Sequence, residues 1–120
     1  MTASNKLELI AGSLTAQRLR DALRDDELRL VYQPKVNMRS GRVVGAEALQ
    51  RWQHPEHGVI PPYLFLPLAE RDDLIVEVGT WVLRAALREL AHWRELGIDL
   101  TVSVNIAPRQ LLHPGFLTTL

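Results

Sequence analysis

The sequence predicts an α/β fold in which two antiparallel strands come first and a parallel strand follows. Strands are predicted over residues 28–36 and 43–52, and the short stretch between them must close a hairpin, because a parallel connection needs a dozen or more residues. A long helix then leads to a further predicted strand at residues 101–106, and strand–helix–strand units are parallel and right-handed. This order looks like the opening of a (β/α) barrel. A complete barrel takes about 200 to 250 residues, so the 120 residues here would form roughly its first half.

The segment before the first strand has two parts. Residues 1–14 are weakly patterned and are expected to be either a loose tail or a linker that ends in a helix. Thr15 is suited to an N-cap, and Leu19 and Ala22 follow it at helical spacing. We therefore expect a helix to begin there and residues 15–120 to belong to one domain.

The remaining elements are predicted from proline, glycine and helical periodicity. Pro34 lies inside the first strand, and proline lacks the backbone donor of a strand ladder, so this strand is expected at a sheet edge or at a bulge. Residues 54–62 are rich in Pro, Gly and His and are predicted to be a loop. Helices are predicted over residues 63–71 and 74–96, and a last short helix is expected to start near Pro108.

Charge and composition restrict the partners of this chain. The 14 basic side chains balance the 14 acidic ones, which gives no electrostatic reason to expect a nucleic acid polymer or an acidic membrane surface as partner. Cysteine is absent, which excludes a disulfide framework and fits the cytosol. No signal peptide opens the chain and no apolar run reaches membrane-spanning length. We therefore expect a cytoplasmic protein without direct membrane contact.

The predicted strand at residues 43–52 carries a charge where a core residue would be expected. Side chains alternate across a strand, so Glu47 shares one face with Leu49 and Arg51, while the opposite face is small and apolar. A carboxylate in such a place is costly unless it is paired or binds a metal. Arg51 stands roughly 13 Å further along the strand, at about 3.3 Å per residue. Glu47 and Arg51 therefore need separate partners.

Asn105 is a second candidate, near the end of the next parallel strand. In (β/α) barrels the working residues lie at the C-terminal ends of the strands, so Asn105 and Glu47 are expected to approach each other. Both side chains offer hard oxygen atoms suited to Mg²⁺ or Mn²⁺. From spacing alone, an asparagine here is more often a hydrogen-bonding residue at a strand end, and Glu47 is as often a strained or paired carboxylate as a functional one.

An ordered set of short motifs resembles one known family. The set comprises Tyr32-Gln33-Pro34, then Glu47-Ala48-Leu49 followed by Arg51-Trp52, and later Val104-Asn105 and Gln110-Leu111. It resembles the signature of the EAL domain, the bacterial cyclic di-GMP phosphodiesterase family. The resemblance implies a TIM-like barrel with one reversed strand, of which residues 15–120 would be the N-terminal half. One departure is Ala107, which stands where the family often has serine.

The resemblance also implies roles for individual residues. Glu47 matches the catalytic, metal-ligating glutamate, and Asn105 matches the metal-ligating asparagine, of a site that uses two Mg²⁺ or Mn²⁺ ions. Arg51 matches the arginine that holds a substrate phosphate, a task suited to a planar guanidinium, and Gln33 and Leu49 are assigned to the substrate. The family's other metal ligands, and the lysine thought to activate water, match nothing in this chain. The chain alone is therefore expected to be inactive.

Two interpretations of the function stay open. The first is an enzyme fragment whose complete form hydrolyses cyclic di-GMP to linear pGpG. The second is a degenerate EAL module that binds cyclic di-GMP or a protein partner without turnover. In both cases the strand at residues 101–106 would be an open edge, and open edges pair with other chains. We therefore expect a homo-oligomer, or association with the remainder of the barrel.

Overall fold

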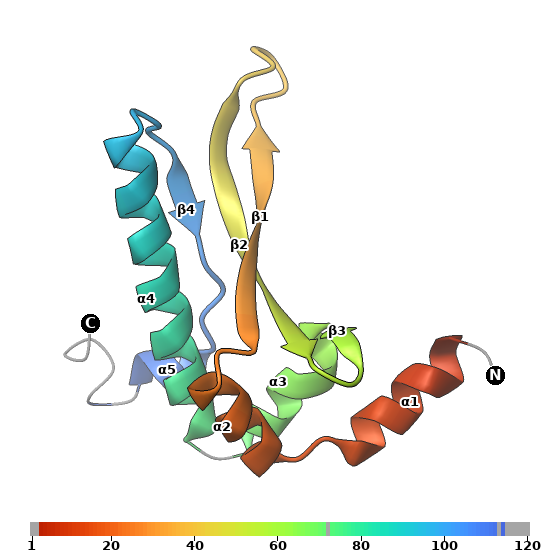
Figure 1. The fold of residues 1–120 in the computed structure, drawn as a ribbon. Coiled ribbons are helices and arrows are strands. Elements are labelled where there is room, and N and C mark those ends of the chain that lie inside the picture. The colour runs from red at the N-terminus through yellow and green to blue at the C-terminus, as the bar shows by residue number, and fades with distance from the viewer. Residues whose placement is uncertain (1–2, 72, 113, 115–120) are drawn as a thin grey trace.

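The computed structural model describes residues 3–71, 73–112 and 114, which form five helices and four strands (Figure 1). In chain order the elements are α1 (Ala3–Ser13), α2 (Ala16–Arg24), β1 (Leu28–Val36), β2 (Val43–His54), β3 (Gly58–Ile60), α3 (Pro62–Glu70), α4 (Leu74–Glu95), β4 (Thr101–Ser103) and α5 (Pro108–Leu112). The predicted α/β class is confirmed. No helix of the described ranges has the length and apolar character needed to cross a membrane.

The sheet is built around β2. Strand β1 pairs with it antiparallel along nearly its whole length, β3 pairs antiparallel with its end, and β4 pairs parallel with its first half. The predicted order of antiparallel and then parallel strands is therefore confirmed. Figure 1 shows α4 running alongside the β1–β2 hairpin, while α2 and α3 gather at the base of the hairpin. Closure of this partial sheet into a barrel stays a prediction.

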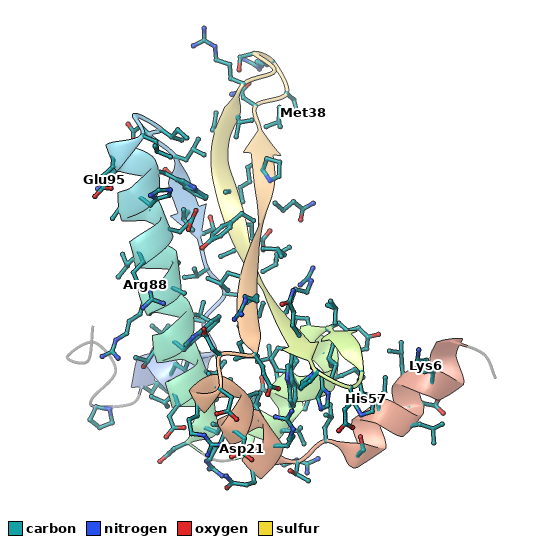
Figure 2. The ribbon with its side chains drawn as sticks, in the orientation of Figure 1. Lys6, Asp21, Met38, His57, Arg88 and Glu95 are labelled. Atoms are coloured by element: carbon teal, nitrogen blue, oxygen red, sulfur yellow. The ribbon has the colours of Figure 1, made fainter. Side chains whose placement is uncertain are left out.

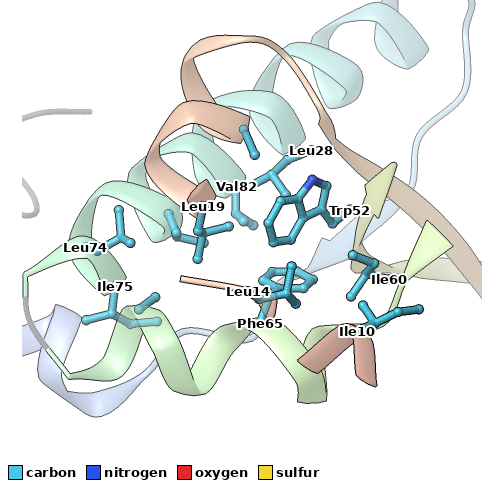
Figure 3. Close-up of a cluster of buried hydrophobic side chains, with 13 residues drawn as sticks. Ile10, Leu14, Leu19, Leu28, Trp52, Ile60, Phe65, Leu74, Ile75 and Val82 are labelled. Atoms are coloured by element: carbon cyan, nitrogen blue, oxygen red, sulfur yellow. The ribbon is translucent and has the colours of Figure 1, made fainter. Parts of the chain in front are cut away.

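The hydrophobic core lies at the base of the hairpin (Figure 3). Trp52 is fully buried there, packs edge-to-face on Phe65 with the ring centroids 5.9 Å apart, and donates its indole N–H to Glu27 Oε1 at 2.9 Å. Helix α1 contributes Ile10 to the same cluster. Residues 3–13 are thus helical, and Ile10 packs this helix on the core, while Lys6, Glu8 and Leu9 are exposed. Truncating a buried aromatic such as Trp52 typically costs about 3–5 kcal/mol.

Several local predictions are confirmed by the hydrogen bonds that begin and end the elements. Thr15 is the N-cap of α2, and its hydroxyl accepts the Arg18 N–H at 3.0 Å. The strand that contains Pro34 lies at the edge of the sheet, with a shift of register just after it. Gly97 follows the end of α4 with a φ of 79°, the left-handed conformation that glycine adopts most easily.

The predicted loop at residues 54–62 was wrong in part, because it contains strand β3. His54 Nδ1 accepts the backbone N–H groups of Glu56 and His57 at 3.0 and 3.3 Å, and this tight turn lets Ile60 pair with Trp52. Because of the same pairing, β2 runs two residues beyond its predicted end. A three-residue strand is defined by its pairing and is too short to show a period of its own.

The predicted strand at residues 101–106 was too long. Strand β4 ends at Ser103, because its ladder pairs only with residues 45–47 of β2. Asn105 therefore lies in the irregular connection between β4 and α5 rather than inside a strand. The predicted start of the last helix at Pro108 is confirmed.

Candidate functional site

The two faces of β2 differ as the alternation of the sequence predicts. Ala46, Ala48 and Trp52 are buried on the face that meets the helices. Glu47 and Arg51, on the opposite face, are only half-buried. The expectation that Glu47 sits inside a core is therefore wrong for the described residues, because no element of that part of the chain covers this face. The carboxylate lies on an open sheet surface where a ligand or a further chain segment can reach it.

The structure brings Glu47 and Asn105 together. The connection from β2 through α4 to β4 is a parallel crossover, and Ser103 stands in register with Glu47. Asn105 follows two residues later, and its Nδ2 donates to Glu47 Oε1 at 3.3 Å. The approach predicted for these two side chains is confirmed, although the contact is near the outer limit of a hydrogen bond.

The donor set fits part of a site for a hard divalent cation. The Glu47 carboxylate and the Asn105 amide lie side by side, and carboxylate and amide oxygens are the ligands that Mg²⁺ and Mn²⁺ prefer. The described residues contain no group of three or more His, Cys, Asp or Glu side chains that could hold a metal ion. Glu47 and Asn105 therefore supply two ligands, and a complete coordination shell needs others from outside these residues.

Gln33 and Leu49 lie on the same face as Glu47. Gln33 stands directly opposite Glu47 in the β1–β2 ladder, so Gln33, Glu47 and Ser103 form one row across three strands. Leu49 is half-buried one pleat further along β2. Both residues predicted to meet a substrate therefore lie next to the carboxylate. Their roles stay predictions.

Arg51 is held apart from Glu47, as predicted from their spacing along the strand. Its guanidinium donates to the Gln50 carbonyl oxygen at 2.7 Å, and within the described residues it forms no ion pair with a carboxylate. Its ladder partner on β1 is Arg29, a second cation on the same face. Like charges opposite each other are unfavourable in a sheet. This end of the face is therefore suited to binding an anion.

Lys35 was missed by the sequence analysis. Its Nζ donates to Ser103 Oγ at 2.9 Å, and it crosses β2 at Gly45, which stands opposite it in the ladder and has no side chain. The alternation of β1 already placed Lys35 on the same face as Gln33. The contact between Lys35 and Ser103 depends on the register of β1, β2 and β4, and no local pattern in the sequence indicates that register.

His54 and His57 form a structural pair at the end of β2. Their rings stack with centroids 4.5 Å apart. Burial lowers the pKa of His54 from its ordinary value, and the nearby Arg18 and His57 lower it further. Nδ1 of His54 is the acceptor that closes the β2–β3 turn, and the lowered pKa favours the neutral imidazole that this contact requires.

Comparison with known proteins identifies the family. The model of the EAL domain matches residues 16–120. The chain belongs to the EAL domain family. The resemblance noted in the motifs around Glu47 and Asn105 is thereby confirmed.

Two curated relatives illustrate the similarity. The cyclic di-GMP phosphodiesterase PdeR of Escherichia coli (strain K12) is 49% identical over 102 residues, which cover 85% of this chain and 15% of that protein. The bifunctional diguanylate cyclase/cyclic di-GMP phosphodiesterase MucR of Pseudomonas aeruginosa is 47% identical over 100 residues, covering 82% of this chain and 15% of MucR. The chain therefore spans about one seventh of the length of these EAL proteins.

Solved structures of EAL domains share the fold. The PaMucR phosphodiesterase in its c-di-GMP complex superposes with a TM-score of 0.80 at 45% identity, and the match covers 86% of this chain and 42% of that one. The FimX EAL domain of Xanthomonas citri, in complex with c-diGMP, gives a TM-score of 0.74 at 29% identity, covering 86% of this chain and 40% of the FimX chain. The described elements thus correspond to less than half of these solved EAL chains.

Proposed function

We propose that this chain is the N-terminal part of an EAL domain that hydrolyses cyclic di-GMP to linear pGpG at a site with two divalent metal ions. In this proposal residues 15–120 supply the first half of a TIM-like barrel and residues 1–14 form a tail or linker. Relatives named as cyclic di-GMP phosphodiesterases and the c-di-GMP complex of PaMucR support the substrate. The 120-residue chain by itself is proposed to be inactive.

The observation that carries the proposal is the contact between Asn105 Nδ2 and Glu47 Oε1 at 3.3 Å. The pair lies at the end of a parallel crossover, which is where the working residues of (β/α) barrels lie. Glu47 and Asn105 would hold a Mg²⁺ or Mn²⁺ ion, which when bound polarises a phosphodiester and lowers the pKa of a bound water. Both residues would act as ligands that fix the geometry of the site.

Arg51, Gln33 and Leu49 would bind the dinucleotide. The Arg51 guanidinium has no carboxylate partner among the described residues, so it is free to hold a phosphate through two parallel hydrogen bonds. Gln33 stands across the ladder from Glu47 and offers an amide beside the ligand pair. Leu49 offers an apolar contact on the same face. Together they would bind the dinucleotide along the face of the sheet that carries Glu47.

Chromatography of the nucleotide products tests the proposal. The parent protein with the complete domain should convert cyclic di-GMP to pGpG in the presence of Mg²⁺ or Mn²⁺. The isolated 120-residue chain should give no product at any metal concentration, because removing essential members of a catalytic group typically costs several orders of magnitude in rate. Turnover by the short chain would contradict the half-site argument.

A binding module is the second candidate. The described residues include a ligand pair and a phosphate-binding arginine but no residue that matches a general base, and that combination is sufficient for recognition. The same assay separates the candidates when it is combined with calorimetry. A complete protein that binds cyclic di-GMP but never yields pGpG would favour the binding module over the enzyme.

A further inference from the structure

Gln110 is a polar residue in the core that the proposed mechanism does not use. It is the third residue of α5, and it is only 2% exposed. Its side chain lies directly against α4 at Gly79, where a Cβ atom would come within 1.1 Å of Gln110 Nε2. Glycine at position 79 therefore leaves the space that this side chain occupies. A buried amide costs free energy unless it is hydrogen-bonded, so its partners indicate why it is there.

The Gln110 amide closes the turn that follows Asn105. Its Oε1 accepts the Ala107 N–H at 3.2 Å, while the Gln110 N–H donates to the Ala107 carbonyl oxygen at 2.9 Å. This is the glutamine half of a capping box, in which the side chain of the third helical residue bonds the N-cap amide. The other half is normally a Ser or Thr hydroxyl at the N-cap, and Ala107 has none. The conformation of this turn therefore depends on Gln110.

A cavity places Gln110 and Asn105 in one environment. It has a volume of about 290 Å³, lies between β2, α3, α4 and α5, and is lined by both residues and by Gln50. Two buried side-chain atoms of the described residues lack a hydrogen-bond partner, Gln110 Nε2 and Gln50 Oε1. A donor and an acceptor in one cavity suit ordered water, which takes about 30 Å³ per molecule in the liquid. Within the described residues, the only protein atom that the Gln110 side chain bonds is thus the Ala107 amide.

We propose that Gln110 is a positioning residue for Asn105, because its side chain fixes the turn that holds this amide against Glu47. The proposal rests on the metal-ligand role proposed above for Asn105 and Glu47. Their contact is already 3.3 Å long, so a small displacement of the turn separates them. Residues that orient metal ligands typically change metal affinity about 10- to 100-fold when they are replaced.

The experiment uses the complete parent protein and two replacements of Gln110. Gln110→Met keeps the length of the side chain and removes its polar atoms, whereas Gln110→Glu keeps an oxygen for the Ala107 amide. Hydrogen exchange of the Ala107 amide in metal-free protein measures the cap, and calorimetric Mn²⁺ titration measures its consequence. We expect Gln110→Met to speed exchange at Ala107 roughly fivefold or more, the size of a lost cap, and to raise the Mn²⁺ Kd about 10- to 100-fold. Gln110→Glu should bring both quantities back toward wild type.

Two controls separate positioning from loss of stability. Gln50→Met makes the same chemical change at the other glutamine of the cavity, whose side-chain oxygen bonds no backbone amide of the described residues. Val82→Ala removes buried volume from α4 in the same cavity and lowers the melting temperature. Both variants should leave the exchange rate of the Ala107 amide and the Mn²⁺ Kd within about twofold of wild type. Loss of a residue that orients a metal ligand raises the Kd about tenfold or more, so the two cases are distinguishable.

The outcomes distinguish this inference from the proposed function. An unchanged Mn²⁺ Kd in Gln110→Met, or an equal rise in Gln50→Met and Val82→Ala, would overturn the inference alone. A wild-type protein that binds no Mn²⁺ would overturn the metal-binding part of the proposed function and this role of Gln110 with it. If Gln110→Met fails to fold, the Kd of Gln110→Glu decides, since a wild-type value supports the cap and a tenfold rise contradicts it.

Discussion

Gly45→Ala tests whether the close approach of β2 and β4 holds the Glu47–Asn105 pair together. A Cβ atom on residue 45 would lie 2.8 Å from the Thr101 carbonyl oxygen, whereas ordinary contact begins at 3.4 Å, so β4 must move by about 0.6 Å. Asn105 Nδ2 is already 3.3 Å from Glu47 Oε1. A displacement of that size along the same direction takes the pair beyond hydrogen-bond distance.

Urea denaturation and Mn²⁺ calorimetry of the complete domain measure the two effects of Gly45→Ala. Overpacking a tight contact costs about 1–3 kcal/mol, so the free energy of unfolding should fall by that amount. The Mn²⁺ affinity should fall as well, because the two ligands no longer face each other. The assay therefore reports the strand contact and the site in one variant.

Gly12→Ala is the matched control. Residue 12 lies in α1, and apart from its chain neighbours and the backbone of its own helix, no atom of the described residues lies within 4 Å of a Cβ added there. Alanine is favoured over glycine in a helix by up to about 1 kcal/mol, so this variant should be as stable as wild type or more stable, with unchanged Mn²⁺ affinity. A Gly45→Ala protein with wild-type stability and affinity would refute the reasoning, because it would show that the two strands have room to spare.

Three further predictions concern the substrate, pH and the open edge. Arg51→Ala in the complete domain should weaken cyclic di-GMP binding by roughly 1.5–3 kcal/mol, the value of a charged hydrogen bond. Calorimetry should show unchanged Mn²⁺ binding in this variant. Unchanged dinucleotide affinity would show that Arg51 has another role. Burial lowers the pKa of His54, so the unfolded chain binds this proton more readily and the free energy of unfolding should fall as the pH drops below about 6.5. His54→Asn keeps a hydrogen-bond acceptor but does not titrate, so it should flatten the pH dependence of the free energy of unfolding. An unaltered pH profile would contradict this role of His54. The isolated chain should self-associate through β4 in sedimentation experiments, because a second edge partner of β4 is absent from the described residues; a monodisperse monomer with a cooperative melt would contradict this.

The sequence predicted the elements whose signals are local. The hairpin follows from the short gap between β1 and β2, and helix α4 follows from its periodicity and from Gly97. Strand β3 and the early end of β4 were missed, because pairing with β2 defines both and neither has a pattern of its own.

The candidate site was predictable to a similar extent. The alternation along β2 separated the Glu47 face from the helix-facing side, and the parallel crossover brought Asn105 to it. The half-burial of Glu47 and the bond from Lys35 to Ser103 were not predictable, because they depend on which elements cover the sheet and on the register of three strands. The cap by Gln110 had a signal, since glutamine stands three residues after Ala107, but the missing N-cap hydroxyl obscured it.

The central claim is that Glu47 and Asn105 are ligands of one divalent metal site, and Mn²⁺ titration of the complete domain tests it most directly. Glu47→Gln and Asn105→Leu should each raise the Mn²⁺ Kd at least about 10- to 100-fold. That factor is typical for loss of a residue that only orients a metal ligand, and loss of a ligand itself should cost no less. Glu95→Gln, which neutralises an exposed carboxylate at the C-terminal end of α4 (Figure 2), should leave the Mn²⁺ Kd unchanged. Wild-type Mn²⁺ affinity in both ligand variants would contradict the account, because the contact between Glu47 and Asn105 would then be an ordinary hydrogen bond at the end of a strand.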